Sequence, residues 1–450
     1  MAPKNIRIIM EIFHHLLKRV PIYSFYFLIG GLALIAAFSV SLVVGVTGKG
    51  TAILVAGLWL CLSALWVLIW LYLNRVPVNR PDKVGVLVVL SCKDSKFYDQ
   101  VSEDFVEALK GDLSRNSSNV IVLRVLNPLL SEKYSDFEDA KSLQRKKKFH
   151  LLIHGAAKKR GSNAFLDLQG NVLHAPIPLE VRDSFRQDIS EKWMPRFAFE
   201  DYEGTVELFE TGSQFVSISA RYVLGKAAFL SRDLFFAEKM FGSCLESCQG
   251  REHFPQVRGI KKGCNESLNT IYINFMGYYY GRWLVDGDCA HIAEAKRWSD
   301  EVFWVYKKRE NYLMLAAIVE ALTGDMPAAQ VALDKVKVNK RGAVWEVNQA
   351  FVHMHLDKFS LAIGVYLKET SLADDLIFQI ENFITLYDEN IKPSARNYLL
   401  LGLLNELMKG DEVRAREDYQ TCIDRYDEKV DGALLELAAK KIPMFSSLLT

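Results

Sequence analysis

The chain lacks the short motifs that identify common classes of enzyme. It has no Gly-x-Ser-x-Gly elbow, and His353 and His355 are two residues apart, not the four that a zinc protease needs. Gly48-Lys49-Gly50 contains the Gly-Lys of a phosphate loop, but the rest of that motif is absent. We therefore predict no catalytic residue, no cofactor and no enzymatic activity, although an enzyme with an unfamiliar site stays open.

An excess of one charge and a cysteine framework are absent as well. Lys and Arg total 55 against 54 Asp and Glu, so we expect no nucleic-acid partner. Seven cysteines are an odd number, which does not indicate a disulfide framework. Cys244 and Cys248 lie four residues apart, with Cys264 beyond them, but this is not the spacing of a structural zinc site. We predict no metal site.

Long apolar stretches are present, because half of the residues are hydrophobic. Residues 20–48 and 51–74 contain no charged side chain, and each exceeds the roughly 20 residues needed to cross a bilayer. Their short connector predicts a two-helix transmembrane hairpin. Lys and Arg flank it on both sides, which predicts an inner-membrane protein with both termini in the cytoplasm. Residues 1–19 are predicted to be a helix in the bilayer interface or an extension of the first span.

Residues 80–200 have the pattern of a small α/β domain. Val84–Leu90 is a continuous β-branched run, typical of a strand that is buried on both faces. A helix follows, with one apolar face from Tyr98 to Leu113. Further strands are predicted over 120–126, 149–154 and 165–168, with a polar helix near 135–147. This order predicts a mostly parallel sheet covered by helices.

Part of this domain is similar to a known family. A first strand, then Phe105-Val106-Glu107-Ala108-Leu109, then the segment from Leu151 to Gly161 resemble the amino-terminal α/β domain of TolB-type proteins. The resemblance covers about residues 80–175. It implies an accessory binding module without catalytic residues, which in bacteria is often joined to membrane segments and tetratricopeptide repeats.

Polar residues follow the predicted strands at the edge where open α/β sheets bind ligands. Ser91, Lys93, Asp94 and His154 are therefore the candidate ligand-binding residues. A phosphate group could use Lys93 and the amino end of the following helix. The alternative is an empty, solvated loop.

Two basic clusters lie in the same domain. Each is a solvated surface run or a membrane-facing patch, in which each charge would contribute about 1 kcal/mol of attraction to an anionic leaflet. The clusters contain Arg145, Lys146, Lys147 and Lys148, and Lys158, Lys159 and Arg160.

Residues 205–450 show helical periodicity and a repeated spacing. A small or apolar residue is followed by an Ala twelve positions later and a bulky residue four positions beyond that. The sets are Gly225, Ala237 and Phe241; Ala317, Ala329 and Leu333; Ala350, Ala362 and Tyr366; and Leu403, Ala415 and Tyr419. Gly281, Ala293 and Arg297 fit only the first two positions, and the long gap before Ala415 predicts an extra helix or a degenerate repeat around 372–387.

This spacing resembles the tetratricopeptide repeat (TPR), in which paired antiparallel helices approach closely at small residues. The resemblance implies a TPR-like helical array that binds protein partners, although another α-solenoid would produce similar spacing. An aromatic region supplies candidate partner-binding residues, and core packing is the alternative for them. These candidates are Tyr278, Tyr280, Trp283 and Trp304.

Three hypotheses for the function fit this organisation. The first is a membrane-anchored cytoplasmic scaffold that recruits protein partners through its repeats. The alternative is a ligand-gated membrane sensor-effector in bacterial stress response or phage defence, in which a small molecule at the α/β domain changes the state of a homo-oligomer. A membrane enzyme with an unrecognised site is the third hypothesis.

Overall fold

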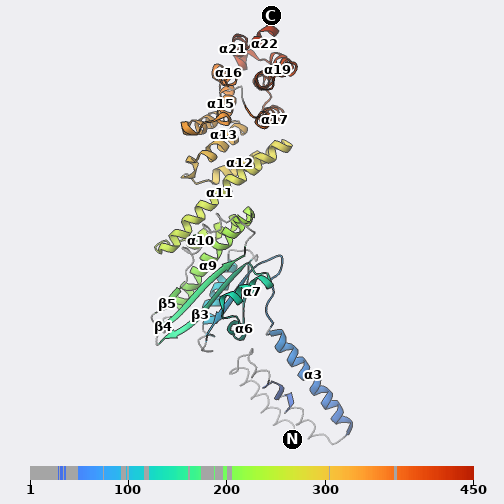
Figure 1. Cartoon of the computed structure of the whole chain (residues 1–450), viewed down its shortest axis with the longest axis vertical. Helices are drawn as coiled ribbons and strands as arrows, with labels where there is room; N and C mark the ends of the chain where they lie inside the picture. Colours follow the sequence, from blue (N-terminus) through green and yellow to red (C-terminus); the bar gives the residue numbers. More distant parts are fainter. Residues whose placement is uncertain are drawn as a thin grey trace. The chain divides into compact units, whose positions relative to one another are not determined.

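A computed structural model shows the arrangement of the chain (Figure 1). It describes residues 29, 31–33, 35–36, 49–73, 75–92, 98, 101–115, 121–160, 163–173, 187, 196–199, 205–303, 305–368 and 372–450. The chain divides into two compact units, Met1–Asn265 and Glu266–Thr450. The division falls within a helix, α11 (Pro255–Asp286).

An apolar helix, α3 (Lys49–Leu73), precedes the sheet. Within the part of the chain that the structure describes, no helix combines the length and the apolar character that crossing a bilayer requires.

This finding contradicts the predicted transmembrane hairpin. The fold class with two spans and the inner-membrane location with cytoplasmic termini are corrected with it. The predicted interfacial segment, residues 1–19, and most of the first predicted span, 20–48, lie outside the described residues.

The first unit contains a five-stranded mixed sheet in the order β2-β1-β3-β4-β5. β1 pairs in parallel with β2 and with β3, whereas the pairs β3 with β4 and β4 with β5 are antiparallel. The sequence predicts a mostly parallel sheet. That prediction is wrong for two of these four strand pairs, which are antiparallel. The reason is the short connection from Arg160 to Asn163, because so few residues can join only antiparallel neighbours. The strands are β1 (Val84–Ser91), β2 (Ile121–Val125), β3 (Leu151–Arg160), β4 (Asn163–Val172) and β5 (Arg196–Phe199).

Short helices cover the sheet, and β1 is buried along its length as its apolar run predicts. Leu87 and Val89 of β1 share a core with Leu143 and Phe149. α7 begins at a capping residue, Asp136, whose carboxylate accepts the amides of the first helical turn. The helices are η1 (Ser102–Val106), α5 (Glu107–Arg115), α6 (Pro128–Lys133) and α7 (Phe137–Lys147).

A helical hairpin follows the sheet in the first unit. It consists of α9 (Thr205–Leu230) and α10 (Leu234–Cys248), and α9 also contacts α5. The two helices approach closely because Gly225 lies against the ring of Phe241, where an added Cβ would be 2.8 Å from Cε1. Gly225, Ala237 and Phe241 are all buried, which accounts for their spacing in the sequence.

The second unit consists of helices, many of them paired in hairpins (Figure 1). α13 contacts α14, α15 contacts α16, and α18 contacts α19. The predicted extra helix is present as α17. The helices are α12 (Cys289–Glu301), η2 (Tyr306–Lys308), α13 (Glu310–Leu322), α14 (Met326–Asp334), η3 (Val338–Lys340), α15 (Ala343–His355), α16 (Phe359–Lys368), α17 (Asp374–Asn390), α18 (Ala395–Leu403), η4 (Leu404–Lys409), α19 (Glu412–Asp424), α20 (Glu428–Asp431), α21 (Leu434–Lys441) and α22 (Pro443–Leu449).

The repeated small and bulky residues form the contacts within these hairpins. Ala329, Ala350, Ala362 and Ala415 have no exposed surface, and the bulky residue of each set is equally buried. The set that fits the spacing only in part behaves differently, since Ala293 and Arg297 are exposed. The sets that fit the full spacing therefore mark packed helical hairpins, whereas the partial set does not. The family to which this helical array belongs stays a prediction.

Candidate functional site

A pocket of about 650 Å³ lies at the carboxyl ends of β1 and β3. We call it the carboxyl-edge pocket. It brings together Ser91 and His154, two of the four residues predicted to bind a ligand. The other two, Lys93 and Asp94, lie outside the described residues. The pocket is lined by Ser91, Ser135, His154, Gly155, Ala156, Lys158, Asp167, Leu168 and Gln169.

His154 is the best-defined polar group of this pocket. Only 7% of its surface is exposed, and its Nε2 lies 3.2 Å from the carbonyl oxygen of Tyr134. Burial lowers the pKa of His154, and the nearby backbone carbonyls of Tyr134 and Ser135 offset this only in part. The ring is therefore neutral near pH 7. With Nε2–H donated to a carbonyl, Nδ1 is an acceptor in this tautomer.

The remaining polar groups of the pocket are partly exposed. Lys158 Nζ lies 3.7 Å from Asp167 Oδ2, and the hydroxyl of Ser91 donates to the carbonyl of Gly155 at 3.3 Å. These groups can orient a small polar ligand. His154 hydrogen-bonds to the backbone carbonyl of Tyr134, which holds its ring in a fixed orientation toward a ligand.

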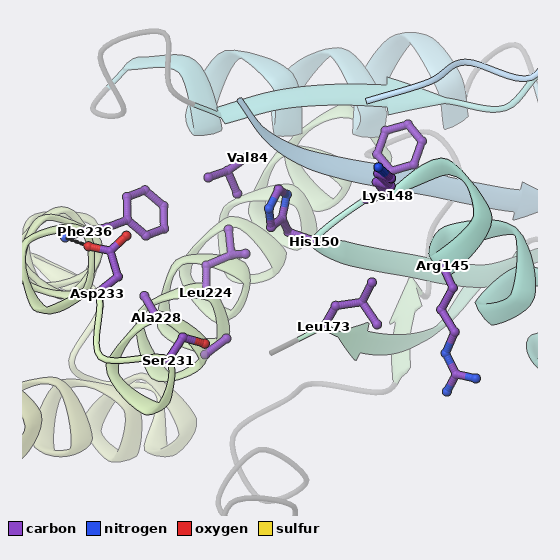
Figure 2. Close-up of a pocket in the computed structure, with 12 residues that line it drawn as sticks. Val84, Arg145, Lys148, His150, Leu173, Leu224, Ala228, Ser231, Asp233 and Phe236 are labelled. Atoms are coloured by element: carbon purple, nitrogen blue, oxygen red, sulfur yellow. Dashed lines mark hydrogen bonds between the residues drawn. The ribbon is translucent and has the colours of Figure 1, made fainter. Parts of the chain in front are cut away.

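A second pocket, of about 630 Å³, lies at the amino ends of the same two strands (Figure 2). We call it the amino-edge pocket. Figure 2 shows His150 between Val84 and Leu224, with the guanidinium of Arg145 directed away from the ring. Its lining comprises Val84, Arg145, Lys148, Phe149, His150, Leu173, Leu224, Ala227, Ala228, Ser231, Asp233 and Phe236.

His150 has a fixed orientation in the amino-edge pocket. Its Nδ1 accepts a hydrogen bond from the amide of Gly85 at 3.1 Å, and its own amide donates to the Gly85 carbonyl at 2.8 Å. Burial lowers the pKa of His150, which keeps the ring neutral. Sequence reasoning missed this pocket because one of its walls comes from α9 and α10, and no local pattern places that hairpin beside β1.

The two basic clusters do not form one surface. Arg145, Lys146 and Lys147 are in the last turn of α7, where the helix dipole favours cations, and Lys148 follows as its cap. Lys158 lines the carboxyl-edge pocket. The side chains of Lys159 and Arg160 lie outside the described residues. These positions do not test the predicted membrane-facing role of the two clusters, which stays a prediction.

The aromatic candidates of the second unit lie in different environments. Tyr278 is 53% exposed, whereas Trp283 is fully buried, with its ring centroid 5.6 Å from that of Phe383. Tyr280 is half-buried beside Trp283, and burial raises the pKa of its phenol. Trp304 lies outside the described residues. Of the described candidates, only Tyr278 is more than half exposed.

Three cysteines lie together beneath α9. Cys244, Cys248 and Cys264 have no exposed surface, and burial raises the pKa of the Cys244 thiol. Thiols in such an environment stay protonated, which disfavours both nucleophilic attack and metal binding. Among the described residues no group of three or more metal-ligating side chains is arranged to hold an ion.

Comparisons with known proteins do not identify a relative of this chain. No family model, no curated protein and no solved structure matches it. The resemblances to TolB-type domains and to tetratricopeptide repeats therefore stay predictions.

Proposed function

We propose that this chain is a protein-binding adaptor, and that the helical hairpins of its second unit bind the partner. The observation that supports the proposal is the packing of α13 with α14, α15 with α16, and α18 with α19 at buried small residues. Stacked helical hairpins bury a continuous core and leave an extended surface, which such proteins use to bind peptides or partner helices.

Exposed apolar side chains on these helices supply candidate anchors. Phe378 of α17 is 68% exposed and Leu361 of α16 is 57% exposed. Aromatic side chains such as that of Phe378 are enriched in protein interfaces, and the burial of apolar surface such as that of Leu361 favours association. A single exposed apolar residue is ordinary on its own, so the two positions have to be tested by substitution.

The test compares the proteins that co-purify with the full chain and with surface variants of it. We expect Phe378→Ser or Leu361→Ser to reduce recovery of a specific partner at least tenfold, while Val338→Ser, at a position 77% exposed, leaves recovery unchanged. Such surface changes alter stability by roughly 0.5 kcal/mol or less, so unfolding would not explain a loss. A partner set that is identical for all three variants would contradict the proposed anchors.

A second candidate function is the binding of a small polar ligand in the carboxyl-edge pocket. The observation that favours it is a pocket of about 650 Å³ containing a buried, neutral His154. This volume lies within the range of roughly 300–1,000 Å³ that small-molecule sites occupy. The edge at the carboxyl ends of parallel strands is also where open α/β sheets bind their ligands.

His154 lies in β3, and His150 immediately precedes that strand and lines the other pocket. The two histidines therefore provide a matched pair of variants for testing this function. Thermal unfolding of the full chain would be recorded with a panel of mononucleotides and small carboxylic acids. A compound that binds in the carboxyl-edge pocket should stabilise the parent and His150→Gln, and should lose its effect with His154→Gln. Equal responses of both variants would exclude this pocket as the binding site.

A further inference from the structure

Arg221 of α9 is a buried cation in the first unit. Only 1% of its surface is exposed, although arginine is almost never buried without a paired carboxylate. Its Nη1 donates to the hydroxyl of Ser217 at 2.6 Å and to that of Ser247 at 3.1 Å. Its Nη2 donates to the backbone carbonyl of Asp112 on α5. All of these acceptors are uncharged.

The charge of Arg221 is therefore not neutralised by an ion pair. Within the described residues no carboxylate lies at ion-pair distance from it, and the Nε–H has no hydrogen-bond partner. The carboxylates of Asp112 and Glu246 are near enough to favour the charged form, but burial outweighs them and lowers the pKa of Arg221. A guanidinium stays charged in proteins, so this arrangement calls for an anion.

A cavity of about 130 Å³ lies beside this guanidinium. Arg251, which follows α10, lines the same cavity and likewise has no ion pair among the described residues. Arg251 is held in place, because its Nε donates to Gln214 Oε1 at 2.9 Å and its Nη1 to the Ser247 carbonyl at 3.0 Å. The lining consists of Asp112, Gln214, Ser217, Ile218, Arg221, Ser247 and Arg251.

We propose that this cavity, formed by α5, α9 and the end of α10, binds a phosphate group between Arg221 and Arg251. Planar guanidinium groups match tetrahedral oxyanions through paired N–H donors, and the hydroxyl of Ser217 adds a further donor. The volume corresponds to a few water molecules, at roughly 30 Å³ each, and is too small for a nucleoside. The site therefore accepts inorganic phosphate or the terminal phosphoryl group of a larger ligand.

The experiment measures the unfolding temperature of the full chain in increasing inorganic phosphate, against potassium chloride at the same ionic strength. We expect a saturating rise with phosphate that chloride does not reproduce. Arg251→Gln should require at least tenfold more phosphate for the same shift. Arg258→Gln is the control, because it removes the same charge from an exposed position of the same unit.

Two further measurements complete the test. Arg221→Lys keeps the charge but removes the planar fork, so a folded variant should lose the phosphate response. Glycerol 3-phosphate distinguishes the two possible ligands. A rise in unfolding temperature with glycerol 3-phosphate would show that the site accepts the terminal phosphoryl group of a larger ligand, and a rise with inorganic phosphate alone would show that it binds the free ion. Equal shifts in chloride and phosphate, or an unchanged response in Arg251→Gln, would overturn the proposal.

Discussion

Two buried arginines, one in each unit, show how differently the same side chain can be accommodated. Arg221 is 1% exposed and Arg396 is 7% exposed. Arg396 Nε lies 2.9 Å from Asp431 Oδ1, and its Nη2 lies 2.7 Å from Asp357 Oδ1. Arg221 has hydroxyl and carbonyl acceptors only, and its Nε–H has none.

The difference distinguishes an arginine that stabilises the fold, Arg396, from one whose charge can still pair with a ligand, Arg221. Arg396 also donates to the carbonyls of Met354 and His355, so it ties α15 to the segment around Asp431. A buried ion pair of this kind tolerates the loss of neither partner. Arg221 lines a cavity and has no ion pair among the described residues, so its charge is open to a bound anion. Burial of a charge alone therefore does not reveal its role, whereas its partners do.

The largest effect expected from this comparison is that of Arg396→Met. The substitution leaves Asp431, which is 3% exposed, as an unpaired buried carboxylate. We expect a loss of about 3–5 kcal/mol in the free energy of unfolding, measured by urea denaturation. A second change, Asp431→Leu, should recover most of that loss. A cost of less than about 1 kcal/mol would show that the pair is not structural.

Glycines extend the comparison to the helical hairpins of the two units. A Cβ added to Gly402 would lie 2.2 Å from the ring of Tyr419, whereas one added to Gly225 would lie 2.8 Å from that of Phe241. We expect Gly402→Ala to cost about 2–3 kcal/mol and Gly225→Ala less, because overpacking is costlier where the approach is closer. Gly364→Ala, with open space around it, should stabilise α16 by about 0.5–1 kcal/mol. Chemical denaturation of the three variants checks the order.

The burial of His355 close to Arg396 also predicts a dependence of stability on pH. Burial, followed by the charges of Arg396 and Lys392, lowers the pKa of His355 to about 3 from its usual 6.5. Between these values the unfolded chain binds a proton that the folded chain does not. Stability is therefore complete above pH 6.5 and falls as the pH falls toward 3, by about 2 kcal/mol between pH 7 and pH 5.

His355→Gln should reduce this dependence, since glutamine does not titrate. Urea denaturation of the parent and the variant at pH 7 and pH 5 gives the comparison. A pH dependence that is unchanged by the substitution would place its origin in other groups, such as His154 and His353, whose pKa values burial also lowers.

The smallest effect is expected for Arg221→Met in phosphate-free buffer. Removing a buried charge that has no counter-charge costs little, and replacement by an apolar side chain is often neutral. We expect a change below about 1 kcal/mol, measured in parallel with Arg396→Met. If the two variants lose a similar free energy of unfolding, the claim that Arg396 stabilises the fold through its ion pairs and Arg221 does not is wrong.

Local patterns predicted many of the elements of this fold. The β-branched run 84–90 is β1, and the interval before Ala415 contains α17. The Ala329 and Ala362 positions lie inside hairpins because close helix packing requires small residues at a regular spacing. Such patterns failed for sheet direction, which the β3–β4 connection decides, and for the two-span hairpin, which the described part of the chain does not contain.

The candidate sites were predicted only in part, for the same physical reason. Topology alone placed Ser91 and His154 at one edge, because parallel strands end together. The amino-edge pocket and the cavity between Arg221 and Arg251 depend on α9 and α10, which contact other parts of the first unit. Nothing in the sequence around Arg221 indicates that a carbonyl 109 residues away accepts from it.

The sequence by itself determined the local elements and the positions at which helices pack in pairs. Periodicity and residue size suffice for these, since they act over one or two turns. Only the tertiary structure decided which charges are neutralised. Asp431 forms an ion pair with Arg396 across 35 residues, while no described carboxylate lies at ion-pair distance from Arg221. Electrostatic pairing depends on distances of a few ångströms between remote segments, and these exist only once the chain is folded.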